Sequence, residues 1–121
     1  ILTSLPNSIT TIGSYAFYEC NNITLTSLPN IDNIYGYTFY NCQQLAISSI
    51  PSTVQSIDYY AFYACRGITT LTFLGTPNRI DYDAFKYCSN LRTIRVPWAS
   101  GAVSGSPWGA TNATIVYNYT P

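Results

Sequence analysis

The sequence predicts a mainly β, right-handed solenoid with repeats of about 23 residues and a capping strand at its C-terminal end. Two observations predict this fold. The four cysteines recur at steps of 22, 23 and 23 residues, and each follows a phenylalanine by three residues; they are Cys20, Cys42, Cys65 and Cys88. Apolar residues around them keep the same step. A fixed period between about 20 and 50 residues is typical of solenoids, in which each repeat forms one coil.

Each repeat places an isoleucine, a phenylalanine and a cysteine at matching positions. In a stack of coils, equivalent side chains form columns, and these apolar side chains are expected to point inward and fill the core. The predicted core residues are Ile12, Phe17, Cys20, Ile34, Phe39, Cys42, Ile57, Phe62, Cys65, Ile80, Phe85 and Cys88.

The elements of one coil follow from short runs of sequence. Residues 23–29, ITLTSLP, are expected to form a main parallel strand, because Ile and Thr favour extended chain and a proline ends the run. A second short strand is expected in residues 9–13, 31–35 and 54–58. The segment from Ala-Phe to Cys is too short for a helix of several turns and is expected to be a turn or a single 3₁₀ turn.

We interpret residues 1–93 as four repeats and residues 94–121 as a C-terminal cap. The tail keeps one apolar step and then departs from the pattern. Trp98 and Trp108 are expected to cover the last open layer, and TIVYNYT alternates like a final strand. The chain begins inside a repeat, so we expect a longer natural array. The first coil then exposes a strand edge through which copies can self-associate.

The cysteine column favours buried, reduced thiols. Free Cys is small, apolar and among the most buried residue types. Stacked coils bring the Cα atoms within reach of a disulfide, but parallel side chains fit its dihedral angle poorly, so disulfides rank second. A zinc site needs four ligands that converge on one point, which a column does not supply. No metal or cofactor is expected.

The pattern resembles the BspA-like, or Treponema-type, leucine-rich repeat, in which an Ala-Phe-x-x-Cys turn and a strand-ending proline recur every 23 residues. Residues 2 to about 93 match it in four copies. Thr38 replaces the alanine in one copy, and the fourth copy lacks the Leu-Pro pair. The resemblance implies a leucine-rich-repeat solenoid from a secreted or cell-surface bacterial protein. It also implies adhesion to a host matrix protein, a glycan or another surface protein, with no catalytic activity in the repeat.

Composition argues against several other classes. The formal net charge is zero and only 8% of residues are charged, which gives a nucleic-acid partner no electrostatic support. No apolar run is long enough to insert into a membrane. The chain has no His, one Glu and one Lys, so options for general acid–base catalysis are few. Asp81 and Asp83, near Arg79 and Lys86, form the one dense charged group, which a solvated turn explains.

Twelve tyrosines are present, and many of them are patterned. The candidate ligand-binding residues flank the Ala-Phe pair or lie at the basic end of the array: Tyr15, Tyr18, Tyr37, Tyr40, Tyr60, Tyr63, Arg92 and Arg95. The simpler interpretation is structural, because stacked rings stabilise neighbouring coils. The functional interpretation is a recognition surface, since Tyr offers a large contact area at a small cost in entropy.

The outward side of the main strands is a second candidate surface. It is expected to carry mostly hydroxyl side chains, interrupted by an aromatic residue and two arginines: Thr3, Ser4, Thr24, Thr26, Ser27, Ser48, Ser49, Thr70, Thr72, Phe73, Arg92 and Arg95. Extended solenoid faces often bind ligands, but a soluble β surface also explains this composition. The sequence therefore favours a non-enzymatic ligand-binding or adhesion module. The rival hypothesis is a spacer solenoid with no ligand of its own.

Overall fold

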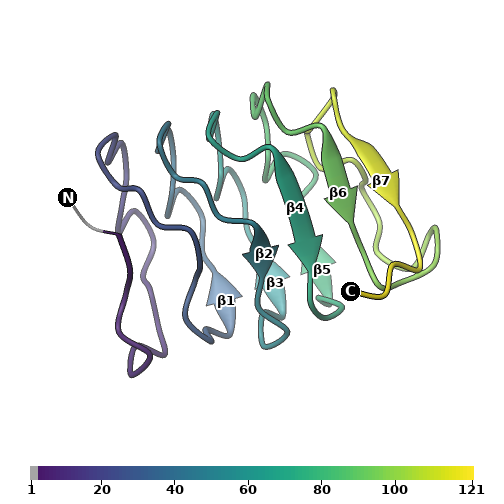
Figure 1. Cartoon of the computed structure of the whole chain (residues 1–121), viewed down its shortest axis with the longest axis horizontal. Coiled ribbons are helices and arrows are strands. Elements are labelled where there is room, and N and C mark those ends of the chain that lie inside the picture. Colours follow the sequence, from purple (N-terminus) through teal and green to yellow (C-terminus); the bar gives the residue numbers. More distant parts are fainter. Residues whose placement is uncertain (1–2) are drawn as a thin grey trace.

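The computed structural model describes residues 3–121 as a stack of coils with a parallel sheet on each of two sides (Figure 1). Sheet A has the order β1-β3-β5, and sheet B has the order β2-β4-β6-β7. The strands of sheet A are β1 (Asn33–Ile34), β3 (Ser56–Ile57) and β5 (Arg79–Ile80). The strands of sheet B are β2 (Ser49–Ile50), β4 (Thr70–Phe73), β6 (Thr93–Arg95) and β7 (Thr114–Val116).

The register of both sheets follows the sequence period. In sheet A, Ile34 is paired with Ile57, and Ile57 with Ile80. In sheet B, Thr72 is paired with Arg95. Each of these pairs is 23 residues apart, so one repeat makes one full coil. No helix occurs in the part of the chain that the structure describes, and the predicted mainly β solenoid with coils of about 23 residues is confirmed.

The Ala-Phe to Cys segments form turns, as predicted. Backbone hydrogen bonds join each turn to the next coil: Phe17 N donates to Thr38 O at 2.9 Å, and Phe39 N donates to Ala61 O at 2.9 Å. Two positions of the turn have positive φ in successive copies: Tyr15, Tyr37 and Tyr60 at the first, and Glu19, Asn41, Ala64 and Tyr87 at the second. A left-handed conformation at non-glycine residues carries strain, and the hydrogen bonds between turns offset it.

The prediction of a regular strand in residues 23–29 is wrong, because this run has no strand assignment. Leu25 and Leu28 are both buried although they are three residues apart. Consecutive residues of a strand point to opposite faces, so this spacing requires a kink between the two leucines. One backbone hydrogen bond, from Ala46 N to Leu25 O at 3.1 Å, still links the run to the next coil. Residues 9–13 likewise have no strand assignment.

In the coil that contains β4, the chain keeps regular strand geometry, unlike residues 23–29. Its side chains alternate, with Leu71 and Phe73 buried and Thr70 and Thr72 facing outward. Alternation with period two is what a strand requires. Phe73 therefore does not interrupt the outward face as the sequence predicted. It occupies the inward position, while Leu74 is pushed out and is 49% exposed.

The predicted core columns lie inside the coils. The phenylalanine rings stack face to face, with centroids 5.4 Å apart for Phe17 and Phe39, then 5.3 Å and 5.2 Å along the column. The residues of this set that are buried are Ile12, Ile34, Phe39, Cys42, Ile57, Phe62, Cys65, Ile80, Phe85 and Cys88. Phe17 and Cys20 are only partly buried, since they belong to the first coil and have a described neighbour on one side.

The tail forms the last coil of the described stack. Strand β7 pairs in parallel with β6, which confirms the predicted final strand. Trp98 and Trp108 are buried against Phe73, and the two indole rings lie 6.1 Å apart at a steep angle. Phe85 N donates to Trp108 O at 2.9 Å, which repeats the bond that joins the earlier turns. The tail therefore repeats the hydrogen bond of the earlier turns and adds two buried tryptophans to the core.

Candidate functional site

Tyrosines cover the turns that lead from sheet A to sheet B. We call this surface the tyrosine ladder and define it by Tyr15, Tyr18, Tyr37, Tyr40, Tyr59, Tyr60, Tyr63 and Tyr87. The six tyrosines proposed from the sequence all belong to it, and their rings contact one another from coil to coil. The structure thus brings this part of the candidate site together.

The ladder contains two columns of rings. In the first, Tyr15 and Tyr37 stack with centroids 4.8 Å apart and planes 4° apart. In the second, Tyr40 stacks on Tyr18 at 4.9 Å and on Tyr63 at 4.4 Å. Parallel stacking follows from the repeat, because the spacing of coils in a sheet is close to the separation of stacked rings.

The first column changes geometry at Tyr60. Its ring meets Tyr37 edge to face at 5.6 Å and stacks instead on Tyr59 at 4.2 Å. The pKa of Tyr60 is raised to about 12, mainly by a side-chain hydrogen bond with Tyr59 and secondly by burial. Burial and then neighbouring tyrosines raise the pKa of Tyr37 and of Tyr40. These three hydroxyls therefore stay neutral at physiological pH, where they both donate and accept hydrogen bonds.

Sequence reasoning missed two members of the ladder. Tyr59 directly precedes Tyr60, and Tyr87 lies two residues after Phe85, outside the two repeated columns. Tyr87 meets Tyr63 edge to face at 5.2 Å and so continues the surface where Asp83 and Lys86 break the pattern. The exposed members are Tyr15, Tyr18, Tyr59 and Tyr87, at 41–56% exposure. The ladder therefore presents both ring surface and hydroxyl groups to solvent.

The charged residues near Asp81 make an ion pair and a local turn contact. Arg79 forms an ion pair with Asp58 across sheet A. Asp83 N donates to the carboxylate of Asp81 at 3.1 Å, which is the contact of a local turn. Neither Arg92 nor Arg95 joins the tyrosine ladder. Arg92 is exposed beside β6, whereas Arg95 lies on β6 with its guanidinium 5.1 Å from the ring centre of Tyr119.

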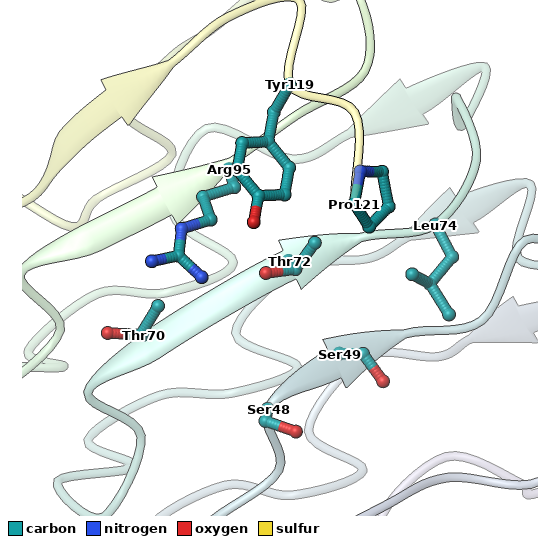
Figure 2. Close-up of a pocket in the computed structure, with 8 residues that line it drawn as sticks. All are labelled: Ser48, Ser49, Thr70, Thr72, Leu74, Arg95, Tyr119 and Pro121. Carbon is teal, nitrogen blue, oxygen red and sulfur yellow. The ribbon is translucent and has the colours of Figure 1, made fainter.

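A pocket of about 520 Å³ lies on the outward face of sheet B, around Arg95. Figure 2 shows the outward side chains of β2 and β4 beneath it, with Arg95, Tyr119 and Pro121 along one side. We call it the Arg95 pocket, and it is lined by Ser48, Ser49, Thr70, Thr72, Leu74, Arg95, Tyr119 and Pro121. Sequence analysis placed four of these hydroxyls and Arg95 on this face. It did not find Leu74, which occupies an apolar position of the repeat but is exposed here, nor Tyr119 and Pro121, which lie outside the repeat.

The cysteines are free, and three of them have a defined bonding role. The thiol of Cys42 donates to Phe17 O at 2.9 Å, that of Cys65 to Phe39 O at 3.1 Å, and that of Cys88 to Phe62 O at 3.0 Å. Each thiol thus binds the carbonyl of the phenylalanine in the preceding coil. Among residues 3–121, no cluster of His, Cys, Asp and Glu is suited to hold a metal ion.

Burial makes the inner thiols unreactive. It raises the pKa of Cys42 to about 11, that of Cys88 to about 12, and that of Cys65 well above its ordinary value. We expect iodoacetamide at pH 8 to modify Cys20 alone in the folded chain, since the thiolate is the reactive form. Peptide mass mapping with and without urea measures this. Equal labelling of Cys20 and Cys65 in the folded chain would contradict it.

The raised pKa values also predict an alkaline limit to stability. The folded state holds the proton of Cys88 up to about pH 12, whereas an exposed thiol loses its proton near pH 9. The neutral Cys88 thiol therefore makes its full contribution to the free energy of unfolding below about pH 9. This contribution is lost as the pH rises toward 12.

Among residues 3–121 there is no helix long and apolar enough to cross a membrane. Neither a comparison with curated proteins nor one with solved structures found a match. The family model for the BspA type leucine rich repeat region, in six copies, does match, and it spans residues 2–103. This match covers most of the chain and agrees with the coils, the parallel sheets and the phenylalanine–cysteine turns described above. The chain therefore belongs to the BspA type leucine-rich repeat family, whose members are generally surface adhesion or binding proteins.

Proposed function

We propose that this chain is a non-enzymatic adhesion module of a bacterial cell-surface or secreted protein. Its ligand is a host matrix protein or a host glycan, and the tyrosine ladder is its contact surface. The observation that carries the proposal is the exposure of Tyr15, Tyr18, Tyr59 and Tyr87 on one continuous aromatic surface. Family membership supports a binding role in general, because leucine-rich repeat modules are binding modules rather than catalysts.

The chemistry of the ladder suits recognition. Tyr is enriched at the energetically important positions of interfaces, where its ring is buried and its hydroxyl finds a partner. The rings of the ladder are already ordered by stacking, as the 4.4 Å contact of Tyr40 with Tyr63 shows. A partner therefore has little side-chain entropy to remove on binding. A protein loop or the apolar face of a sugar ring both fit such a surface.

The proposal predicts that exposed tyrosines are required for binding. We would immobilise host matrix proteins and glycans and measure saturable binding of the chain by surface plasmon resonance. A variant with Tyr15, Tyr18, Tyr59 and Tyr87 changed to Ser is expected to bind at least about tenfold more weakly, because each of several contact residues contributes. These four side chains are exposed, so the fold should persist.

Tyr82→Ser is the matched control. Tyr82 is 65% exposed but makes no ring contact with the ladder among the described residues. Its replacement should leave binding unchanged. If both variants bind like the wild type, the contact surface is not the ladder. If the folded wild-type chain binds nothing on the array, the spacer hypothesis is preferred and the stacked rings serve only stability.

A further inference from the structure

The Arg95 pocket is a second site, and it shares no residue with the tyrosine ladder. Its floor consists of the hydroxyl side chains of β2 and β4. In Figure 2, Thr70 and Thr72 lie on β4, Leu74 follows the end of that strand, and Ser48 and Ser49 lie on the neighbouring chain segment. The side opposite Ser48 and Ser49 is formed by Arg95 and by the tail that carries Tyr119 and Pro121.

The tail is held in place over the sheet. Tyr119 N donates to Val96 O and Asn118 N donates to Trp98 O, each at 2.9 Å. The ring of Tyr119 lies 5.1 Å from the guanidinium of Arg95, which is within the range of a cation–π contact. This contact orders the guanidinium without neutralising it. The edge of its planar group retains the N–H donors that match the two oxygens of a carboxylate.

No acidic side chain forms an ion pair with Arg95 among residues 3–121. The five acidic residues lie in the turns or next to strands of sheet A: Glu19, Asp32, Asp58, Asp81 and Asp83. The one ion pair of residues 3–121 joins Arg79 to Asp58. The charged side chains on or beside the outward face of sheet B are therefore the basic ones Arg92 and Arg95. An anion that approaches this face meets no acidic side chain, and Arg95 forms no ion pair among residues 3–121.

The other residues that line the pocket indicate what kind of molecule carries the anionic group. Hydroxyls both donate and accept hydrogen bonds, so those of Ser49, Thr70 and Thr72 complement the hydroxyls of a sugar. Tyr119 and Leu74 add apolar surface for the C–H groups of a sugar ring. A volume of about 520 Å³ lies within the range of small-molecule sites.

We propose that the Arg95 pocket binds an acidic saccharide, with Arg95 pairing with the carboxylate and the hydroxyl row of β2 and β4 contacting the ring hydroxyls. An extended acidic peptide fits less well. Such peptides commonly bind by adding a strand to a sheet edge, and this pocket lies over β4, which already pairs with β2 and β6. The backbone groups of β4 are thus engaged within the sheet, and recognition depends on side chains.

The test uses a matched pair of ligands with the whole chain. Methyl β-D-glucuronide and methyl β-D-glucoside have the same ring and differ in a carboxylate against a hydroxymethyl group. We expect the glucuronide to bind at least about tenfold more tightly in an NMR titration, as a charge-assisted hydrogen-bonded pair warrants. Its affinity should fall as salt is added, because the pocket is open to solvent.

Variants assign the effect to one side chain. Arg95→Gln should reduce glucuronide affinity about tenfold and bring it close to that of the glucoside. Arg92→Gln is the control, because it removes the same charge from an exposed residue outside the pocket. Arg95→Lys keeps the charge but loses the planar fork, so an intermediate affinity is expected. It also keeps the test decisive if Arg95→Gln does not fold.

Several results would overturn the proposal. One is equal affinity for the two glycosides, or no binding of either by the folded chain. A second is an equal loss in Arg92→Gln and Arg95→Gln, which indicates only a general charge effect. A third is tighter binding of the tripeptide Gly-Glu-Gly than of the glucuronide, which assigns the pocket to acidic peptides. None of these results depends on the tyrosine ladder, so the adhesion proposal is tested separately.

Discussion

Phe62→Ala should lower the free energy of unfolding by about 3–5 kcal/mol, the usual cost of removing a large buried ring. Phe62 is fully buried, and its ring stacks between those of Phe39 and Phe85 at 5.3 Å and 5.2 Å. The substitution leaves a cavity in the middle of the column, where coils on both sides are held by turn-to-turn hydrogen bonds and cannot close it. Urea unfolding followed by circular dichroism measures the loss.

Phe17→Ala provides the comparison within the same column. Phe17 is partly buried and stacks on one ring only, that of Phe39. Its loss should therefore cost less than half as much as the loss of Phe62, because less apolar surface returns to water and solvent can fill the space. An equal loss for the two variants would show that the phenylalanine column does not act as a stack of local contacts.

Trp108→Ala should have a similarly large effect, about 3–5 kcal/mol, and should act on the last coil. Trp108 is fully buried and packs against Phe73 and Trp98. Without its ring, the packing against Phe73 and Trp98 in the last coil is lost, while the backbone bond from Phe85 N to Trp108 O can remain. Hydrogen exchange should therefore show faster exchange at Val96 N, which donates to Val116 O across the β6–β7 pair.

A comparison of the two tryptophans isolates the contribution of the indole N–H hydrogen bond to stability. The indole N–H of Trp108 donates to Ser104 O at 2.9 Å, whereas that of Trp98 is buried without a hydrogen-bond partner among the described residues. Trp108→Phe should therefore destabilise the chain by about 1 kcal/mol more than Trp98→Phe. The opposite order would mean that the bond to Ser104 contributes nothing to the stability of the last coil.

The core of the solenoid was predictable because its positions are set by period alone. Ile34, Ile57 and Ile80 are register partners in sheet A, as their equal spacing required. The turn was predictable for the same reason, since a segment between two fixed columns has little freedom in length. The bonding role of the cysteines was not predicted. The thiols of Cys42, Cys65 and Cys88 each donate to a carbonyl 25 or 26 residues away, and the sequence does not show which carbonyl that is.

The prediction of a main strand was wrong for residues 23–29, because the spacing of apolar residues was considered without the direction of their side chains. Two apolar residues three apart, such as Leu25 and Leu28, point inward only if the chain kinks between them, and the run then loses regular strand geometry. In β4, the strand geometry is regular, and Phe73 rather than Leu74 points inward. Both are large and apolar, so composition alone does not distinguish them.

The sequence by itself determined the repeat, the family and the columns of Phe, Cys and Tyr, because identical coils must superpose equivalent side chains. Only the tertiary structure decided which residues meet across different columns. Tyr59 turns onto Tyr60, Tyr87 extends the ladder, and Tyr119 reaches back to Arg95 to form a pocket. These contacts depend on side-chain direction and on the path of a tail that leaves the period, and a repeat pattern specifies neither.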